Sequence, residues 1–329
     1  MIAVTTDDMA ITGNSDQAVT WFKNKIKGVY EITDLGYLCW FLGMEIKCNY
    51  ATCTISINQS AYIEGMATKF RLTSAKPIYV PMLPGEVLSC DRSPSMPAEA
   101  TKMSKIPYGN MIGHMLWPVM IPCPDAVFAT GILSQFISNL SLAHIKALKH
   151  LISYLYTTQN CWLMFSGKNT KILMYMDADY AQQANHHSIS GYCLIFGARA
   201  ISWSLKKQNI VTLSSTEAEY VRHTNAMKEI LWIQNFWAKI NGKSMENQFS
   251  TRFCSKPATR VQFNYPTTIN FVCTKHIDVH YHFIRKALKN KLLEIKYVPT
   301  DKNIADIFTK LLSRPLFKKF RIMLGLCYA

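Results

Sequence analysis

The chain has 329 residues, more than the ~100–200 of a typical domain, so two domains are expected, and its 49% of hydrophobic residues can build a sizeable core. A formal net charge of +15, from 36 Lys and Arg against 21 Asp and Glu, favours a polyanionic partner, either nucleic acid or an anionic surface. Ten cysteines with no Cys-x-x-Cys pair and no histidine at zinc spacing argue against a zinc ribbon and a disulfide scaffold.

No segment has the pattern of a signal peptide or a membrane span. The first residues, MIAVTTDD, lack a basic region, and the most apolar stretch, MIGHMLWPVMIPCP, contains three prolines and a histidine. Roughly 20 uninterrupted apolar residues are needed to cross a bilayer. We therefore expect a soluble intracellular protein, cytoplasmic or nuclear, with reduced thiols and no membrane partner.

The first half of the chain alternates helical and strand-like segments around a linker. Four segments precede the linker, in the order helix 14–30, strand 37–47, strand 52–58 and helix 59–71. Residues 80–102 are rich in Pro, Ser and charged side chains, which is typical of a surface linker. Helical spacing returns at 125–139 and 142–158, the latter with apolar residues at steps of three or four: Leu142, Ile145, Leu148, Leu151 and Leu155.

From about Lys171 the pattern changes to strands. Three short runs rich in β-branched or aromatic residues are separated by Gly or polar turns, as expected of antiparallel neighbours: 171–178, 189–197 and 200–207. A long helix is predicted at 214–240, where Thr216 and Glu219 have the spacing of a capping box. The remaining segments alternate as strand 248–255, helix 275–290, strand 291–299 and a short final helix 303–310. This order predicts a mixed sheet flanked by helices.

Acidic residues fall at informative places on this scaffold. Asp177 and Asp179 close an apolar strand, where a buried core does not need acids but a metal site does. Glu219 continues the apolar stripe of the long helix and should face the sheet, whereas Glu217 should face elsewhere and favour the helix dipole. Asp306 lies in the short final helix. From position alone, a capping or turn role explains these acids equally well, and strand parity does not choose between Asp177 and Asp179.

Long motifs carry a resemblance to a known family. The run from Tyr175 to Ile233, with KHIDVHYHFIRKALKNKLLEIKYVPTDKNIADIFTK downstream, resembles the ribonuclease H domain of copia-type retrotransposon polyproteins over residues 171–325. Earlier motifs, including DDMAITGN, EITDLGYLCWFLGMEIK and MSKIPYGNMIGHMLW, resemble the end of the reverse transcriptase in the same polyproteins. The resemblance implies an α/β protein. A C-terminal RNase H-like mixed five-stranded sheet flanked by helices would follow a truncated α+β region from the palm end, thumb and connection of a reverse transcriptase.

The resemblance and the composition together predict four segments. A truncated reverse transcriptase, palm end and thumb-like, would occupy residues 1–80, and a linker would follow at 81–103. A helical connection region is predicted at 104–170 and the RNase H-like domain at 171–329.

The resemblance implies a metal-dependent nuclease. In the family's site, four carboxylates gather two Mg²⁺ ions, which Mn²⁺ can replace, around the scissile phosphate of RNA paired with DNA. Carboxylates suit this role because Mg²⁺ is a hard cation that binds oxygen. Carried over residue by residue, the catalytic and metal-binding acids are Asp177, Glu219 and Asp306, and Asp179 becomes a turn residue.

The third acid of the family's pattern is missing. The chain reads RFCSKPATRV at this point, with Ser255 in place of the aspartate and Lys256 in place of an asparagine. Serine is a weak neutral ligand and the lysine adds positive charge, so a loss of several orders of magnitude in activity is expected. Asp278 and Asp301 are the remaining acids that could substitute, and neither is expected to do so.

The polymerase motif is altered as well. VTTDDMAITGN resembles the Tyr-x-Asp-Asp turn of reverse transcriptases, so Asp7 and Asp8 correspond to two metal ligands, and they are expected to be vestigial. Thr5 and Thr6 replace the family's tyrosine and apolar residue. Because the segments that supply the remaining palm aspartate are not in the chain, independent polymerisation of nucleotides is not expected.

Several basic and aromatic residues either contact nucleic acid or have an ordinary structural role. Five cations are candidate phosphate contacts or solvated charge: Lys206, Lys207, Lys318, Lys319 and Arg321. Three tryptophans could stack on bases, although their amphipathic placement favours core packing: Trp203, Trp232 and Trp237. His276 and His280 share a helix face but lack a third metal ligand, and the His186–His187 pair is expected in a solvated loop.

Three functions from different classes are compatible with these features. The chain is a hybrid-specific nuclease joined to a reverse-transcriptase remnant, a noncatalytic basic module that binds nucleic acid, or a translated relic. RNA/DNA hybrid or another nucleic acid is the expected partner, and a complete retrotransposon polymerase is a further one. An integrase is excluded, because integrases need Asp, Asp and then Glu with about 35 residues between the last two, whereas the order here is Asp177, Glu219, Asp306.

Overall fold

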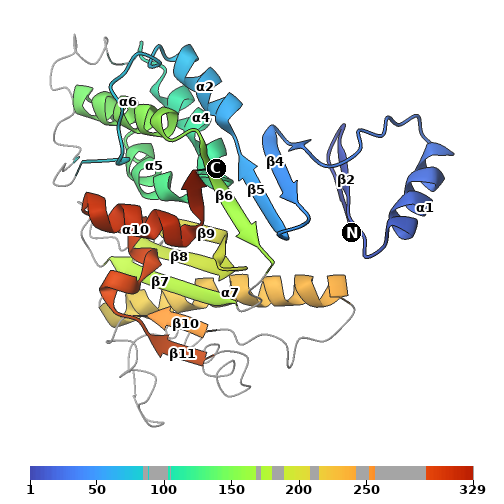
Figure 1. Cartoon of the computed structure of the whole chain (residues 1–329). Coiled ribbons are helices and arrows are strands. Elements are labelled where there is room, and N and C mark those ends of the chain that lie inside the picture. Colours follow the sequence, from blue (N-terminus) through green and yellow to red (C-terminus); the bar gives the residue numbers. More distant parts are fainter. Residues whose placement is uncertain are drawn as a thin grey trace.

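The computed structural model in Figure 1 describes residues 1–83, 88, 103, 105–167, 172–179, 189–207, 215–241, 252–255 and 294–328. For residues 178–179, 215–222, 241, 252–255 and 294–296 it describes the backbone alone. Most of the predicted linker and the helix predicted at 275–290 lie outside the described residues. None of the described helices is long and apolar enough to cross a membrane.

A small N-terminal hairpin and a helix stand apart from the rest of the chain in Figure 1. Strands β1 (Ile2–Val4) and β2 (Met9–Ile11) pair antiparallel, and helix α1 (Asp16–Lys27) follows. The Ser15 hydroxyl accepts a hydrogen bond from the backbone N–H of Ala18 and so caps α1. No residue of α1 is buried, so this part contributes little to the hydrophobic core.

One antiparallel sheet joins residues 40–58 to residues 326–328. Its strands in spatial order are β12 (Leu326–Tyr328), β6 (Cys161–Ser166), β5 (Thr54–Asn58), β4 (Met44–Asn49) and β3 (Trp40–Phe41). The buried Asn58 donates from Nδ2 to the carbonyl oxygens of Gln159 and Cys161, both at 2.8 Å, which fixes the start of β6 beside β5.

Helices pack beside this sheet. They are α2 (Ser60–Lys69), α4 (Tyr108–Met120), the 3-10 turn η2 (Pro124–Ala126), α5 (Val127–Ser134) and α6 (Leu142–Thr157). A capping box begins α6, because the Ser141 hydroxyl and the His144 ring each accept a hydrogen bond from the other residue's backbone N–H. Ile145, Leu148, Leu151 and Leu155 of α6 are buried, which confirms the predicted apolar face there. Leu142, at the first position of the helix, is 52% exposed, so its place on that face is wrong.

A second, mixed sheet forms the C-terminal half. Its spatial order is β11 (Glu294–Tyr297), β10 (Arg252–Ser255), β7 (Leu173–Asp179), β8 (Ile189–Phe196) and β9 (Arg199–Lys207). Strands β7, β8 and β9 are antiparallel neighbours, whereas β10 runs parallel to both β7 and β11. Three antiparallel strands followed by two parallel ones are the predicted RNase H-like α/β arrangement, which is therefore confirmed.

Each face of the mixed sheet is covered by different elements. Met174 and Met176 of β7 pack with Ala226 and Ile230 of the long helix α7 (Ser215–Asn241). The alternate residues of the strands face the other way, toward the 3-10 turn η4 (Ile304–Phe308) and helix α10 (Arg314–Leu324). The apolar stripe that helical spacing predicts for α7 is thus confirmed at Ala226 and Ile230, although Ile240 near its end is exposed; its members are Ala226, Ile230, Ile233, Trp237 and Ile240.

Several elements lay outside the sequence prediction. They include β1 and β2, then α4, whose interior contains Pro118, and β6, α10 and β12. The short final helix predicted at 303–310 is a 3-10 turn preceded by another, η3 (Thr300–Lys302), and α10 follows it. The division of the chain into four segments stays a prediction, and β12 contributes a strand of the last segment to the sheet of the earlier ones.

A buried ion pair attaches α10 to the helical layer. Arg321 of α10 places Nε 2.9 Å from Oδ2 of Asp125 in η2, and its Nη2 donates to Sγ of Cys161 at 3.1 Å. The Tyr154 hydroxyl donates to the same carboxylate, and burial with the charge of Asp125 holds the pKa of Tyr154 well above its usual value. Burial likewise raises the pKa of Cys161 to about 11, so the thiol stays neutral beside the guanidinium.

Asp125→Asn should destabilise the folded chain by about 3–5 kcal/mol, because it leaves the buried Arg321 guanidinium without its counter-ion. The free energy of unfolding from urea denaturation measures this change. Asp34→Asn, which breaks the exposed pair of Lys23 and Asp34, is the matched control and should have a much smaller effect. Equal losses in the two variants would contradict a buried role for the Asp125–Arg321 pair.

Candidate carboxylate site

Asp177 lies near the end of β7, on the face of the mixed sheet that η4 covers. It is 0% exposed and pairs across the sheet with Gly191 of β8. A Cβ atom at Gly191 would lie 2.8 Å from Cγ2 of Thr309 and 2.9 Å from Cβ of Phe308. Only a glycine at this position lets η4 and Thr309 approach the strand pair that carries Asp177.

Asp306 reaches the same place from η4. It is buried, and its Oδ1 accepts a hydrogen bond from Nδ2 of Asn303 at 3.0 Å. The same amide nitrogen donates to the carbonyl oxygen of Met176 at 3.1 Å. Asn303 therefore holds Asp306 against the residue that precedes Asp177, and the fully buried amide fixes η4 on β7.

Thr309 and Lys310, which follow η4 directly, complete the contact between η4 and β7. The Thr309 hydroxyl donates to Oδ2 of Asp177 at 2.6 Å. Lys310 Nζ lies 2.9 Å from Oδ2 of Asp177 and 3.2 Å from Oδ2 of Asp306. Two buried carboxylates that share one ammonium are a concentrated negative charge in a low dielectric, which is stable only with a cation beside it.

The donor set suits a hard cation. Carboxylate oxygens are the ligands that Mg²⁺ and Mn²⁺ prefer, and two of them here approach one position from β7 and η4. Among the residues with described side chains, no group of three or more His, Cys, Asp or Glu residues is placed to hold a metal ion. The side chains of Glu219 and Ser255 lie outside that set.

The backbone places the two remaining positions of the predicted site. Glu219 belongs to α7, seven residues before the buried Ala226, and α7 covers the face of β7 opposite to Asp177. Ser255 is the last residue of β10 and follows Cys254, whose partner in β7 is Tyr175. The carboxyl end of β10 thus lies beside that of β7. The roles of Glu219 and Ser255 stay predictions.

Other predicted positions fall into two groups. Some lie outside the residues with described side chains: Asp179, His186, His187, Glu217, Lys256, His276, Asp278 and His280. Asp301, in contrast, is described. It is exposed and pairs with Lys319 at 3.7 Å, so it does not join Asp177 and Asp306.

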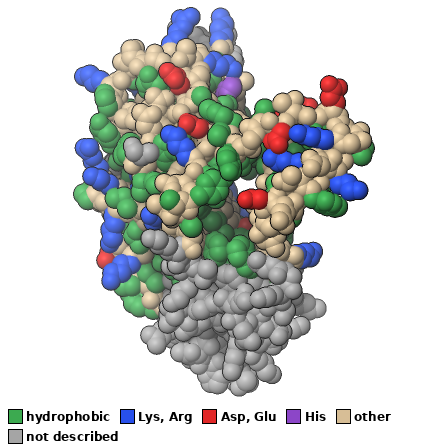
Figure 2. Space-filling model, turned by 45° about the vertical axis from the view of Figure 1, so that its right-hand side comes forward, with side chains coloured by type: hydrophobic (Ala, Val, Ile, Leu, Met, Phe, Trp, Pro, Cys, Tyr) green, Lys and Arg blue, Asp and Glu red, His purple; other side chains and the backbone are tan. Residues whose placement is uncertain are grey.

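The three predicted phosphate contacts on α10 differ in their exposure to solvent. Lys318 and Lys319 of α10 are exposed, but Arg321 is only 8% exposed and pairs with Asp125, so its assignment as a nucleic-acid contact is wrong. The helical period turns Arg321 inward with Phe317 and Leu324 while Lys318 and Lys319 face solvent. Figure 2 shows Lys and Arg side chains spread over the described surface in that view rather than gathered in one patch.

Lys206 and Lys207 lie at the end of β9. Lys206 is exposed and Lys207 is half-buried, so both remain candidates for contact with phosphate.

The three tryptophans for which core packing was predicted differ in burial. Trp203 donates from Nε1 to the carbonyl oxygen of Val119 at 3.0 Å, which agrees with core packing. Trp232 is 60% exposed and stacks on Phe236, so core packing is wrong for this residue.

Trp237 is half-buried and meets the Phe196 ring edge-on, with ring centroids 5.2 Å apart, which agrees with the predicted core packing.

Asp7 and Asp8 lie in the turn between β1 and β2. Thr5 closes this turn, because its backbone N–H donates to the carbonyl oxygen of Asp8 at 2.9 Å and its hydroxyl accepts from the Asp8 N–H at 3.3 Å. Both aspartates are exposed. The motif is thus a hairpin turn, and its vestigial polymerase role stays a prediction.

Asn303, Thr309 and Lys310 were not predicted as part of the site. The available signal was their position in the run NIADIFTK, where polar residues interrupt a short apolar segment around Asp306. Each of them also has a partner more than 120 residues away in the sequence, in β7, and spacing alone does not show these distant contacts.

Comparison with known proteins gives matches along nearly the whole chain. The family model described as reverse transcriptase (RNA-dependent DNA polymerase) matches residues 1–84. The chain is 31% identical over 322 residues to the retrovirus-related Pol polyprotein from transposon TNT 1-94 of Nicotiana tabacum, covering 97% of this chain and 24% of that protein. It is 30% identical over 329 residues to the Pol polyprotein from transposon RE1 of Arabidopsis thaliana, covering 97% and 21%.

The chain therefore spans about a quarter or less of the length of these curated relatives. Among solved structures, the LC11-RNase H1 from compost, in complex with an RNA/DNA hybrid, is 17% identical with a TM-score of 0.30. That match covers 40% of this chain and 88% of the solved one.

Thr309→Val should lower the free energy of unfolding by about 1.5–3 kcal/mol, because it removes a hydrogen-bond donor to a buried carboxylate while keeping the side-chain shape. Thr309→Ser keeps the hydroxyl and should recover most of the loss. Urea denaturation with linear extrapolation measures both variants. If Thr309→Val were as stable as the native chain, the contact between Thr309 and Asp177 would not hold η4 on β7.

Proposed function

The chain belongs to the copia-type retrotransposon Pol polyprotein family, and on that premise we propose that its C-terminal half is a weakened ribonuclease H that hydrolyses the RNA strand of RNA/DNA hybrids. The observation that carries the proposal is the meeting of Asp177 and Asp306. These carboxylates come from strand β7 and turn η4, are both buried, and share one cation at 2.9 and 3.2 Å. A buried pair of acids costs stability unless it serves to bind a cation.

Asp177, Glu219 and Asp306 are the residues that would hold two Mg²⁺ ions, or Mn²⁺ in their place. When bound, such ions activate a water molecule and stabilise the leaving 3′ oxygen. The chain's own contribution is to fix the ligands. Asn303 orients Asp306 through its amide, and Thr309 orients Asp177 through its hydroxyl. Ligands held in this way bind metal without the cost of ordering them first.

Ser255 is the reason for a weakened rather than a full activity. The register of β10 with β7 supports its position beside the strand that carries Asp177. A hydroxyl there supplies neither the charge nor the strong oxygen ligand of an aspartate.

A noncatalytic nucleic-acid-binding module is the second candidate. Ser255 at the third acid position and the net charge of +15 favour it. Lys206, Lys207, Lys318 and Lys319 are the cations proposed to contact phosphates in either case.

The N-terminal residues are proposed to associate with a complete polymerase of the same family rather than to polymerise alone. The exposed apolar side chains Trp21, Leu35, Tyr37 and Trp40 support this, Leu35 at 85% exposure being the most open of the four. Tyr37 also lies beside the exposed Tyr50, with ring centroids 5.6 Å apart, and apolar side chains that gather in water are typical of a surface that another protein covers.

Ser255→Asp should increase cleavage of the RNA strand of an RNA/DNA hybrid by at least about a hundredfold, or about 2.7 kcal/mol in the barrier, because it supplies the missing ligand. The assay uses the full chain in Mg²⁺ and in Mn²⁺. Adding Asp177→Asn to Ser255→Asp is the control and should abolish the gain. Absence of cleavage by the native chain and by both variants, all of them folded, would favour the noncatalytic module. Strong cleavage by the native chain would show that Ser255 does not limit the site.

Replacing Lys206 and Lys207 together with Gln should weaken binding to hybrid and flatten its salt dependence. Each lost phosphate contact lowers the slope of log K against log salt by about 0.9. Fluorescence anisotropy at several salt concentrations gives this slope. The paired replacement of Lys25 and Lys27 on α1 is the matched control, and a slope equal in the two double variants would exclude Lys206 and Lys207 from the interface.

A further inference from the structure

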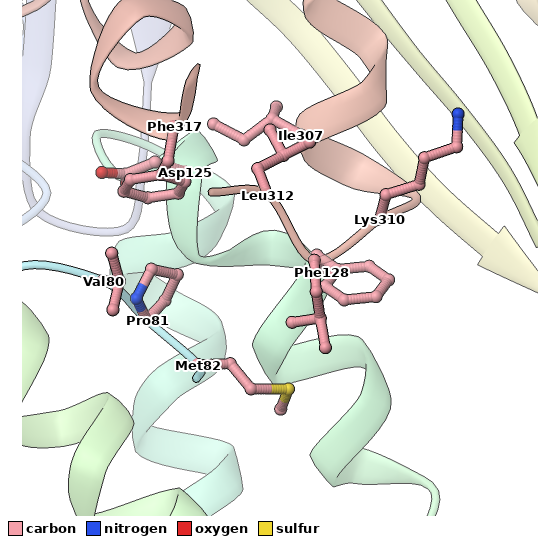
Figure 3. A pocket seen from close by; sticks show the side chains of 10 residues that line it. Val80, Pro81, Met82, Asp125, Phe128, Ile307, Lys310, Leu312 and Phe317 are labelled. Carbon is pink, nitrogen blue, oxygen red and sulfur yellow. The ribbon is translucent and has the colours of Figure 1, made fainter. Parts of the chain in front are cut away.

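Lys310 gives the carboxylate site a cation of its own. Its Nζ bridges Oδ2 of Asp177 and Oδ2 of Asp306, although only the second of these is a neighbour in sequence. The stem of Lys310 lines a cavity of about 20 Å³ together with Phe128 and Ile307, among other residues. Figure 3 shows the amine pointing away from Asp125 and Phe317, out of this cavity. The stem is packed, and the charged end is directed at the two acids.

A divalent ion held by the same two acids would need the position that the ammonium occupies. Mg²⁺ binds carboxylate oxygens at about 2.0–2.1 Å, closer than the ammonium contacts here. The two cations would then lie within a few ångströms of each other, where like charges repel strongly in a buried site. Simultaneous binding of both cations at Oδ2 of Asp177 and Oδ2 of Asp306 is therefore unfavourable.

The side chain of Lys310 can leave the acids. It is 29% exposed, whereas the carboxylates that it contacts are buried. A lysine carries its charge on a flexible four-carbon stem and is readily hydrated once it reaches water. Arg321 provides the contrast, because its side chain is only 10% exposed and its guanidinium is held by Asp125 and Cys161 together. Thr309 holds Asp177 through a separate hydrogen bond that does not involve Lys310.

We propose that Lys310 is a built-in counter-ion that competes with divalent cations for Asp177 and Asp306. It stabilises the metal-free chain and lowers the affinity of the site for metal, so metal binding is coupled to withdrawal of the lysine. Lys310 is thus a positioning residue, which acts through the two acids. This inference rests on the proposed function of the site, and it is tested by metal binding rather than by cleavage.

The test is a titration of the full chain with Mn²⁺, followed by electron paramagnetic resonance of the free ion. Lys310→Met removes the charge and keeps the length of the stem, and it should bind Mn²⁺ about tenfold more tightly than the native chain, which corresponds to about 1.4 kcal/mol. Without metal, the same variant should melt at a lower temperature than the native chain. Lys23→Met, which removes an exposed lysine paired with Asp34 at 2.9 Å, should leave the Mn²⁺ affinity unchanged.

Two further variants keep the result decisive. Lys310→Arg retains a cation and should bind Mn²⁺ more weakly than Lys310→Met. This difference is expected even where Lys310→Met, which removes the charge, is the less stable of the two folded variants. Asp177→Asn added to Lys310→Met should remove the gain in affinity. Equal Mn²⁺ affinity in the native chain, Lys310→Met and Lys310→Arg would overturn competition by Lys310 while leaving the metal site in place. Absence of Mn²⁺ binding in all folded variants would overturn the metal-dependent function as well.

Discussion

The contact between residues 303–310 and strand β7 is the constraint on which the candidate site depends. One amide, that of Asn303, bonds both to the backbone of β7 and to Asp306, so it sets the position of η4 and of the acid at once. The absence of a side chain at Gly191 makes the approach sterically possible. Because these groups are fully or almost fully buried, the contact excludes water from the acids, and the electrostatic interaction of the acids with any nearby cation is strengthened.

The position of η4 is in turn tied to the helical layer. Buried residues of α4, α5 and α6 belong to the same hydrophobic cluster as Ile304, Phe308 and Phe320, so the two halves of the chain share a core. The ion pair of Asp125 with Arg321 and the pairing of β12 with β6 cross the same boundary. The residues that precede the mixed sheet are therefore part of the support of the carboxylate site, which a description of the RNase H-like sheet alone would miss.

Local patterns predicted much of this structure, and the exceptions have physical causes. Strand alternation and the stripe on α7 predicted elements of the mixed sheet. The meeting of Asp177 and Asp306 was implied by the family resemblance and not by local pattern, which left a capping or turn role for each acid equally open. Arg321 was misassigned because a run of basic residues reads as one patch, whereas a helix turns successive residues by 100°. Pro118 concealed α4, since proline is unfavourable inside a helix. Thr309 and Lys310 depend on contacts across more than 120 residues, which no local pattern contains.

Ser255 and Lys310 act in the same direction in the proposed site. An RNase H-like site with four carboxylates has enough negative charge to hold two divalent ions and still tolerate a lysine nearby. Replacement of one carboxylate by Ser255 removes a ligand from the metal, whereas the ion pairs of Lys310 with Asp177 and Asp306 do not involve that position. The balance between the ammonium and the divalent ions therefore shifts toward the ammonium. On this argument the loss of a single acid weakens metal binding by more than the bond that it supplied, because the internal competitor keeps its ion pairs with the two remaining acids.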